Sequence, residues 1–381
     1  MNKIRVMFAM GGNMKRAGAE TMVMQYLRQL IKNKNFEFSI LVHGYDKGDY
    51  DDEINAMGVP IYHVPIRGQK PLIYSYKVKE VFNNHPVDII HCNMDSACGD
   101  FLYIAKKCGI KIRIAHSHTT QFQAKTGIKK VIGFLSRQRV NQVSTIRLAC
   151  SSEAGEWLYR GKDFKIIHNA IELQDYIPND NAIINKKLAL GISCSAFVIG
   201  NVGRLCYEKN QKFLIDLFCL YKISHPNSKL LLIGEGRNKS DLVKYATSKG
   251  CEENVLFLGL REDVPSLLQI MDVYVMPSLF EGLPVSGIEA QAAGLPCLFS
   301  DNITPEICMT DYAKRLPLGS IQKWNEALEN IPKIRNVAEA QKKLQDSGFD
   351  IKTEAEKLTD IYFDAFLSKR CDGASDENDQ L

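Results

Sequence analysis

The stretch SLFEGLPVSGIEAQAAGLP, residues 278–296, holds two glutamates around a glycine and a proline. It follows the apolar run DVYVMP (272–277), which predicts a buried strand. A helix is predicted to begin near Pro284, because proline suits the first helical position. Gly282 allows the chain to turn and to approach a ligand closely. Free amides at residues 283–286 would then favour a phosphate group.

The two glutamates point to a different ligand group. Glu281 lies in the turn before the predicted helix, and Glu289 lies more than one turn inside it. A carboxylate beside bound phosphate is unfavourable unless it binds something else, and one carboxylate can accept hydrogen bonds from two sugar hydroxyls. One glutamate therefore suits a hexose and the other a ribose, as in a sugar nucleotide. An acidic helix start, favoured by the helix dipole, leaves the intervening glycine and proline unexplained.

Short apolar runs alternate with helical patterns on both sides of this stretch. Such runs are typical of parallel strands covered on both faces. Two series, separated by a polar stretch around 172–186, predict two doubly wound α/β halves that bind ligands beyond the carboxyl ends of their strands. The runs are KIRVMFAM (3–10), EFSILVHG (37–44), VDIIHCN (87–93), IKIRIAHSH (110–118), IRLACSS (146–152), AFVIGNVG (196–203), KLLLIGEG (229–236), NVLFLGL (254–260), DVYVMPS (272–278) and LPCLFSD (295–301).

Length and composition agree with two globular domains. The chain has 381 residues, of which 45% are hydrophobic and 24% charged. The net charge of +4 suits an anionic ligand or a membrane surface and is too small to indicate nucleic acid. The 11 cysteines include no CxxC pair, which favours a reducing compartment. With neither a signal peptide nor a membrane-spanning apolar run, the expected location is cytoplasmic.

Polar residues and glycines follow other predicted strands. Arg204 and Lys209 follow the first strand of the second half, where two cations suit a diphosphate. The loop GGNMKRAGAE, with Gly12 and Gly18, resembles a phosphate-binding turn but matches neither GxGxxG nor the Walker pattern. Solvated surface cations and an ordinary strand-to-helix turn are the alternative interpretations.

Two histidines close another strand, in the sequence AHSH. The period of two in a strand puts His116 and His118 on one side, where one of them could face a ligand as a hydrogen-bond donor. A structural role is the usual alternative for a single histidine.

The stretch FEGLPVSGIEAQAAGLP resembles the Glu–x7–Glu signature of retaining glycosyltransferases of family 4, which have the GT-B fold. Further segments resemble the family in the same order, up to about residue 366, and SDNITPEI and SGFDIKT resemble its capsule and exopolysaccharide branch. These segments are GGNMKRAGAETMVMQYLRQL, IRIAHSH, IIHNAIEL, VGRLCYEKNQKFLI, LLLIGEGRNKSDL, VLFLGLREDVPSLL and DVYVMPS.

The resemblance implies a role for each motif. Arg204 and Lys209 would bind the nucleotide diphosphate, Glu289 the ribose, and Glu281 the transferred sugar. Either His116 or His118 would approach the 6-hydroxyl of the sugar or the reaction centre. The family has Asn–Gly where this chain has Asn169–Ala170, and we expect little effect on donor binding. The other implied donor contacts are Gly12, Gly18, Leu260, Arg261, Gly282, Leu283, Pro284 and Val285.

The GT-B fold implies two Rossmann-like domains that face each other across a cleft, with a last helix that returns to the first domain. We expect an acceptor domain at 1–175 plus about 355–370, a donor domain at 176–354, and a disordered tail at 371–381. The expected reaction moves a hexose-type sugar, with retention, from a nucleotide-diphosphate sugar, with uridine as the expected base. The acceptor would be a saccharide or lipid-linked saccharide in surface polysaccharide synthesis, and no cofactor is expected.

Three other functions predict different behaviour. A GT-B sugar-nucleotide 2-epimerase would form product without an acceptor. A nicotinamide-dependent oxidoreductase predicts a clean GxGxxG, which is absent, and hydride transfer visible by absorbance. A non-catalytic sugar-binding module would bind the donor without turnover.

An Asp–x–Asp triplet, Asp49–Tyr50–Asp51, raises the question of a metal. It lies in an acidic loop, and its neighbours Asp46, Asp52 and Glu53 are typical of a solvated charge cluster. Two cations and a helix start already suit the diphosphate, so no metal is expected.

The segment KTGIKKVIGFLSRQRVNQ (125–142) predicts a basic amphipathic helix. Its apolar residues fall at helical spacing, so the helix could lie on an anionic bilayer, which would place the protein on the inner face of the plasma membrane. A helix packed on the first domain with a solvated basic face is the alternative. The residues are Lys125, Lys129, Lys130, Arg137 and Arg139, with Ile128, Val131, Ile132 and Leu135.

Overall fold

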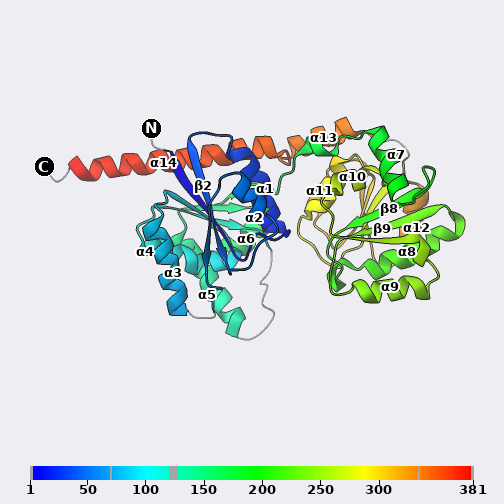
Figure 1. Ribbon diagram of the computed structural model, residues 1–381, viewed down its shortest axis with the longest axis horizontal. Coiled ribbons are helices and arrows are strands. Elements are labelled where there is room, and N and C mark those ends of the chain that lie inside the picture. The colour runs from blue at the N-terminus through cyan, green and yellow to red at the C-terminus, as the bar shows by residue number, and fades with distance from the viewer. Residues whose placement is uncertain (1–2, 69–70, 120–127, 333–334, 379–381) are drawn as a thin grey trace. The chain divides into compact units, whose positions relative to one another are not determined.

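The computed structural model describes residues 3–68, 71–119, 128–332 and 335–378. The chain divides into two compact units (Figure 1). Unit 1 consists of Met1–Ala170 and Ile351–Leu381, and unit 2 consists of Ile171–Asp350. Each unit contains one parallel sheet.

Unit 1 is built on a seven-stranded sheet in the order β3-β2-β1-β4-β5-β6-β7. Its strands are β1 (Ile4–Met10), β2 (Phe36–His43), β3 (Ile61–Val64), β4 (Ile89–Asn93), β5 (Ile112–Ser117), β6 (Ile146–Ala149) and β7 (Lys165–Ile166). Its helices are α1 (Gly18–Leu30), α2 (Asp51–Ala56), α3 (Pro71–Asn84), the 3-10 turn η1 (Asp95–Ala97), α4 (Cys98–Lys107), α5 (Ile128–Val143), α6 (Ser152–Tyr159) and α14 (Ile351–Asn378).

Unit 2 is built on a six-stranded sheet in the order β10-β9-β8-β11-β12-β13. Its strands are β8 (Phe197–Val202), β9 (Ser228–Ile233), β10 (Val255–Gly259), β11 (Val273–Met276), β12 (Cys297–Ser300) and β13 (Ala313–Leu316). Its helices are α7 (Asp180–Ala189), α8 (Gln211–Ser224), α9 (Lys239–Ser248), α10 (Val264–Gln269), α11 (Val285–Ala292), α12 (Ile321–Glu329) and α13 (Val337–Asp346). Short 3-10 turns are η2 (Leu173–Tyr176), η3 (Tyr207–Lys209), η4 (Glu252–Asn254) and η5 (Pro305–Ile307).

The continuous apolar strands are explained by a core on each face of each sheet. In β1, Val6 and Phe8 pack into one buried cluster, while Met7 between them packs into the cluster on the other face. In β8, Val198 and Ile199 separate in the same way. Side chains alternate between the faces of a strand, so a strand covered on both faces needs apolar residues at nearly every position.

Three strands were not predicted from the sequence, and all three are edge strands. They are β3, β7 and β13, each at the end of its sheet. The sequence of β13 is AKRL, in which Lys314 is exposed. An edge strand has a partner on one side only and is partly open to water, so its sequence needs no apolar run.

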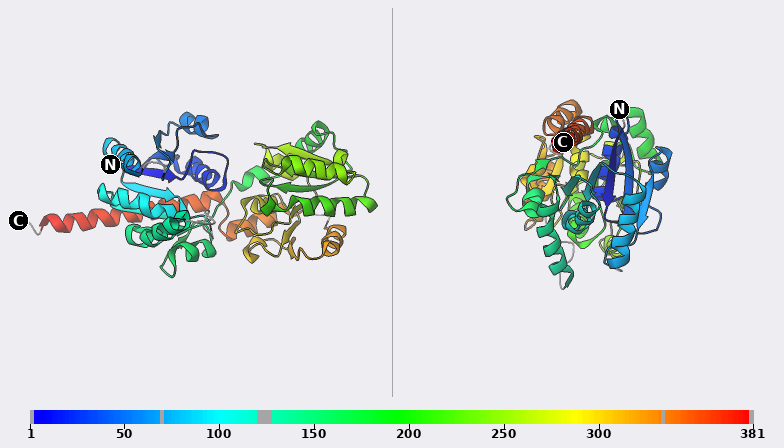
Figure 2. Two further views of the ribbon diagram at one scale, coloured as in Figure 1. Left: turned by 90° about the horizontal axis from the view of Figure 1, so that it is seen from below. Right: turned by 90° about the vertical axis from the view of Figure 1, so that its left-hand side faces the viewer.

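Helix α14 belongs to unit 1 and packs along α1 (Figures 1 and 2). One side of the helix is apolar and buried, since Leu358 and Tyr362 lie in the core and Phe366 packs against it. The helix continues to Asn378 and so includes most of the segment from residue 371 onward that was expected to be disordered. Extending an existing helix costs far less than starting one. Residues 379–381 lie outside the described residues.

None of the helices in the described residues combines the length and apolar composition that a bilayer crossing requires.

Candidate functional site

The predicted donor residues of unit 2 follow three strands, β8, β10 and β11, and therefore share the carboxyl edge of the sheet. The loop after β8 is fixed by the loop after β9. Gly203 N–H donates to the Ile233 carbonyl (2.9 Å), and Leu205 N–H donates to the Glu235 carbonyl (2.9 Å). A Cβ on Gly234 would collide with the Gly203 carbonyl oxygen. The tight glycine packing thus sets the path of the segment that carries Arg204 and Lys209.

Lys209 and Glu281, predicted to bind different parts of one ligand, form an ion pair with each other. Lys209 Nζ lies 2.6 Å from Glu281 Oε1, and the two side chains are only 16% and 21% exposed. Glu281 pairs as a β-bridge with Ile303. The lysine stem crosses Gly203, where a Cβ would stand 3.3 Å from Lys209 Cε. The glycine leaves room for the lysine to reach this position.

The loops that carry the ion pair are tied to each other through their backbones. Leu279 N–H donates to the Glu208 carbonyl (2.8 Å). The Asn210 side-chain amide donates to the Pro277 carbonyl (3.1 Å). The lysine and the glutamate therefore approach each other from a braced backbone.

Helix α11 begins beside Glu281 without a side-chain cap. Pro284 is its N-cap residue, so the helix starts one residue later than the sequence suggested. Ser286 Oγ lies 3.0 Å from the Tyr274 hydroxyl, and a Cβ on Gly282 would meet no atom within 4 Å. The start of the helix therefore leaves amide groups available to an anion.

Glu289 lies on α11 and is held by a tyrosine that the sequence analysis missed. The Tyr176 hydroxyl donates to Glu289 Oε1 at 3.0 Å. Burial raises the pKa of Glu289, and the Tyr176 hydrogen bond opposes this shift. Tyr176 lies in η2, more than a hundred residues from its partner in the sequence, so no local pattern could have indicated it.

The other predicted donor contacts of unit 2 are more open. Arg204 is exposed, and Leu260 is 66% exposed. Arg261 forms a two-pronged pair with Asp263, with both nitrogen–oxygen distances at 2.8 Å. Lys186 contacts the same carboxylate at 2.6 Å, and together these cations lower the pKa of Asp263. The guanidinium of Arg261 is thus already occupied, and Leu260 beside it is free for an apolar contact.

His116 and His118 in unit 1 lie on one side of β5, as predicted, with ring centroids 4.3 Å apart. Their environments differ. His116 is fully buried, and its Nδ1 lies 3.0 Å from His91 Nε2. His118 is partly exposed just beyond the strand, and its Nε2 lies 3.0 Å from Asn93 Oδ1. Its backbone N–H donates to Asp95 Oδ1 at 2.6 Å.

The histidines form one network that reaches α14. His91 Nδ1 lies 2.6 Å from the Tyr362 hydroxyl. Burial lowers the pKa of His91 to about 3 and also lowers the pKa of His116 and of His118. Neutral imidazoles therefore occupy this position. His91 and Tyr362 were missed as site residues because their spacing resembles that of ordinary core residues.

Of the other unit 1 residues named from the sequence, Asn169 contacts this network, and the two glycines belong to the glycine-rich loop. Gly12 and Gly18 flank the loop before α1, and an added Cβ on either would meet no atom within 4 Å. Burial lowers the pKa of His118, and a side-chain hydrogen bond with Asn169 opposes this shift.

The acidic loop before α2 is more ordered than a solvated cluster. Asp51 is buried and accepts a hydrogen bond from Gly48 N–H at 2.8 Å, so it is not solvated as its acidic neighbours were expected to be. Exposed Asp49 accepts a hydrogen bond from Arg16 N–H at 2.9 Å. The two carboxylates shape this loop and the glycine-rich loop. Among the described residues, no group of three or more His, Cys, Asp or Glu side chains is arranged to hold a metal ion.

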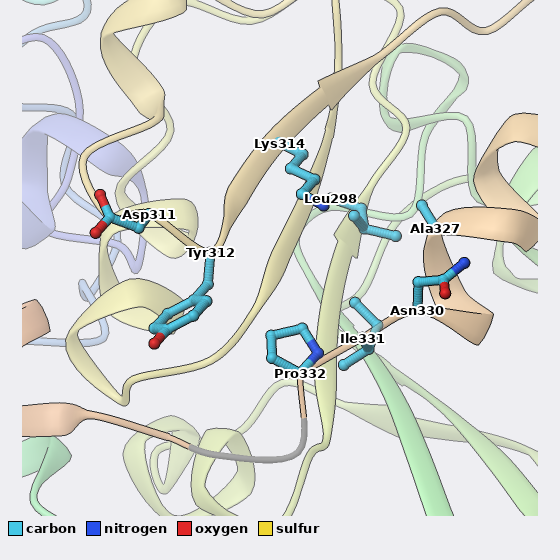
Figure 3. Close-up of a pocket in the computed structure, with 8 residues that line it drawn as sticks. All are labelled: Leu298, Asp311, Tyr312, Lys314, Ala327, Asn330, Ile331 and Pro332. Atoms are coloured by element: carbon cyan, nitrogen blue, oxygen red, sulfur yellow. The ribbon is translucent and has the colours of Figure 1, made fainter.

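A pocket in unit 2 lies away from these residues (Figure 3). It has a volume of about 250 Å³ and is lined by Leu298, Tyr312, Ile331 and neighbouring residues. Tyr312 directly precedes β13, so the pocket lies toward the amino ends of the strands. Ligands of doubly wound folds bind at the opposite edge, and this pocket contains none of the predicted site residues.

Comparisons with known proteins give separate family matches for the first and the second half of the chain. Residues 16–175 match the model for Glycosyltransferase Family 4, and residues 185–345 match that for Glycosyl transferases group 1. A Bacillus subtilis (strain 168) protein, named as a candidate glycosyltransferase EpsF, is 32% identical over 94% of this chain and 96% of its own length. The Escherichia coli UDP-Gal:alpha-D-GlcNAc-diphosphoundecaprenol alpha-1,3-galactosyltransferase is 27% identical over 90% of this chain and 92% of its own length.

The structural comparison supports the fold. The crystal structure of Anabaena Alr3699/HepE in complex with UDP covers 94% of this chain and 99% of its own, with a TM-score of 0.76 and 19% identity. The predicted fold class is confirmed, since both units are Rossmann-like and the structural neighbours are GT-B glycosyltransferases. The chain belongs to the glycosyltransferases that join a family 4 domain to a group 1 domain.

Proposed function

We propose that this glycosyltransferase moves a hexose-type sugar, with retention of configuration, from a UDP-sugar to a saccharide or lipid-linked saccharide of a surface polysaccharide. The observation that carries this proposal is the juxtaposition of Lys209, Glu281 and the uncapped start of α11 at one sheet edge. Cations and amides suit a diphosphate, and carboxylates suit sugar hydroxyls. The Escherichia coli relative is named for a UDP-Gal donor and a lipid-linked acceptor, which supports the same classes here.

Each residue has a proposed task in unit 2, the proposed donor domain. Lys209, Arg204 and the amides of α11 stabilise the charge that grows on the leaving diphosphate. Glu281 accepts hydrogen bonds from the transferred sugar, and Glu289 accepts them from the ribose. Exposed Leu260 contacts the base. We expect front-face attack, in which the leaving phosphate accepts the proton of the acceptor hydroxyl.

His118 is our choice for the histidine that approaches the sugar from unit 1, the proposed acceptor domain. It is partly exposed just beyond the end of β5, and its Nε2 lies 3.0 Å from Asn93 Oδ1. His116 is fully buried and bound to His91, so we assign it to holding His118 in place.

A donor and acceptor assay tests this proposal. We expect thermal stabilisation by UDP-sugars in a panel of nucleotide sugars, and transfer of sugar to an acceptor with the anomeric configuration of the donor, read by NMR. Product formed without acceptor would favour the 2-epimerase. Stabilisation without turnover on any acceptor would favour a binding module.

No divalent metal enters the proposed reaction, because Arg204, Lys209 and α11 suit the leaving group. Activity should be unchanged after exhaustive EDTA treatment. An Asp49→Asn/Asp51→Asn variant should keep its kcat, although loss of the hydrogen bond from Gly48 should lower its Tm. Activity that EDTA removes and manganese restores would overturn this assignment.

We also propose that unit 1 contacts an anionic membrane through the exposed side of α5 and α3. Ile132 and Leu135 on α5 are 47% and 55% exposed, and Leu72 on α3 is 88% exposed. Arg137 does not belong to a solvated basic face, because it is buried and lies over Phe134 and Trp157. On this side of α5 the solvent-exposed positions thus include apolar Ile132 and Leu135, whereas Arg137 is not among them. Residues 125–127 lie outside the described residues, as do the side chains of residues 128–131.

Basic residues around these helices complement an anionic surface. Asp100 on α4 pairs with Arg67 (2.6 Å) and Arg139 (2.7 Å), and thereby joins the loop before α3 to α5. Lys106 and Lys107 on α4 are exposed. Apolar side chains among basic ones are typical of a surface that lies in a membrane interface.

Vesicle co-sedimentation tests the membrane contact. The protein should sediment with phosphatidylglycerol-containing vesicles, less so at high salt, and not with pure phosphatidylcholine. Ile132→Ser/Leu135→Ser should weaken sedimentation, whereas Ile223→Ser, at a 79% exposed position of unit 2, should not. No binding at low salt would contradict this part of the proposal.

A further inference from the structure

The ion pair between Lys209 and Glu281 occupies the side chains that the donor needs. The distance is 2.6 Å, and both side chains are mostly withdrawn from water. Such a pair interacts more strongly than a fully exposed one because the surrounding dielectric is lower. The braced loops hold the two backbones in place, so ligand binding must act on the side chains.

The two halves of a nucleotide sugar affect this pair in opposite ways. A diphosphate seeks the Lys209 ammonium and is repelled by the Glu281 carboxylate beside it. Sugar hydroxyls donate hydrogen bonds to that carboxylate and replace the lysine as its partner. A nucleoside diphosphate without sugar has no group to offer Glu281, and it must compete for the lysine.

We propose that Glu281 selects the nucleotide sugar against the free nucleoside diphosphate by competing with the diphosphate for Lys209. This inference rests on the proposed function. With the intact donor, the sugar binds Glu281 and releases Lys209 for the diphosphate. After transfer, the sugar has left, Glu281 takes Lys209 back, and the affinity for the nucleoside diphosphate product falls. The glutamate that binds the sugar thus also promotes product release.

This exchange of the Lys209 partner, between Glu281 and the diphosphate, predicts that removal of the Glu281 carboxylate increases the affinity for the free nucleoside diphosphate. The full-length Glu281→Gln protein should bind UDP about 3- to 10-fold more tightly than wild type by calorimetry, as expected from loss of a competing pair of about 1 kcal/mol. The same variant should bind the UDP-sugar donor more weakly than wild type. Glu281→Ala should repeat both trends if the Gln variant is unstable. Equal or weaker UDP binding by the variants would overturn the exchange.

Two controls separate the exchange from a simple change in net charge. Asp216→Asn also removes one carboxylate from an ion pair of unit 2, in which Asp216 lies 2.7 Å from Lys249, and its affinity for UDP should equal that of wild type. In a Lys209→Gln background, Glu281→Gln should no longer tighten UDP binding. A gain that persists without Lys209 would show general repulsion and overturn the proposal.

The same experiment distinguishes this inference from the proposed function. If UDP and other nucleoside diphosphates bind neither wild type nor variant, the proposed donor site fails, and the exchange fails with it. If UDP binds wild type and Glu281→Gln with equal affinity, the donor site stands and only the exchange fails.

Discussion

The two units build their candidate site residues on different electrostatic principles. In unit 2, Lys209 and Glu281 form a braced ion pair at the sheet edge, and Glu289 accepts a hydrogen bond from Tyr176. In unit 1, His91, His116 and His118 form a desolvated network in which burial lowers every pKa. Fixed charges suit an anionic ligand, whereas neutral imidazoles suit hydroxyl groups. We propose that this contrast separates the binding of a charged donor in unit 2 from the contact with sugar hydroxyls in unit 1.

The largest effects should come from removing the charges of unit 2. Lys209→Ala and Glu289→Ala should each lower kcat/KM by about 10- to 150-fold, since a lost charge-assisted contact costs about 1.5–3 kcal/mol and water cannot restore the geometry. Circular dichroism should show intact folds. If either purified variant keeps wild-type kcat/KM, the charges of unit 2 do not bind the donor as we propose.

The histidines of unit 1 should separate into two behaviours. His118→Ala should lower kcat by about 100-fold with little change in Tm, as expected for a group that acts at the reaction centre. His116→Ala should mainly destabilise, by about 2–4 kcal/mol, because it leaves a cavity and an unpaired His91. Steady-state kinetics and urea denaturation measure the two effects. Equal behaviour of the two variants would remove the distinction between these residues.

The pH dependence of stability should also come from unit 1. His91 has a pKa of about 3 in the folded protein, below its ordinary value of 6.5. The unfolded chain therefore takes up the proton first, so stability is complete above pH 6.5 and falls as the pH decreases toward 3.

A single substitution should reduce this slope. Between pH 6 and pH 4, His91→Gln should reduce it by about 1.4 kcal/mol per pH unit in urea denaturation. An unchanged slope in His91→Gln would contradict the buried neutral state.

The smallest effect should come from Tyr176. Its hydroxyl stabilises the ionised form of Glu289, so Tyr176→Phe should raise the pKa of that carboxyl. The donor KM should rise about 3- to 10-fold near neutral pH, and the acidic limb of the pH–rate profile should move to higher pH. Tyr245→Phe removes a similar hydrogen bond, from Tyr245 to Asp216 (2.7 Å), and should leave the limb in place.

Much of the fold could be predicted because the strands of a doubly wound sheet are apolar on both faces. Phe8 and Met7 serve opposite cores, so β1 reads as one continuous run. The edge strands β3, β7 and β13 could not be predicted, since partial exposure removes that signal. The same limit applies to Asp51, whose burial depends on a hydrogen bond from the Gly48 backbone.

The sequence alone determined which chemistries were available and in what order they occur along the chain. Glycine, proline and two glutamates near one predicted helix start indicated a sugar nucleotide, because local geometry and residue type are encoded together there. Only the tertiary structure decided the partners: Lys209 with Glu281, Tyr176 with Glu289, and His91 between His116 and Tyr362. These contacts join residues 25 to 271 positions apart, and such distances close only when strands assemble into a sheet and α14 packs on unit 1.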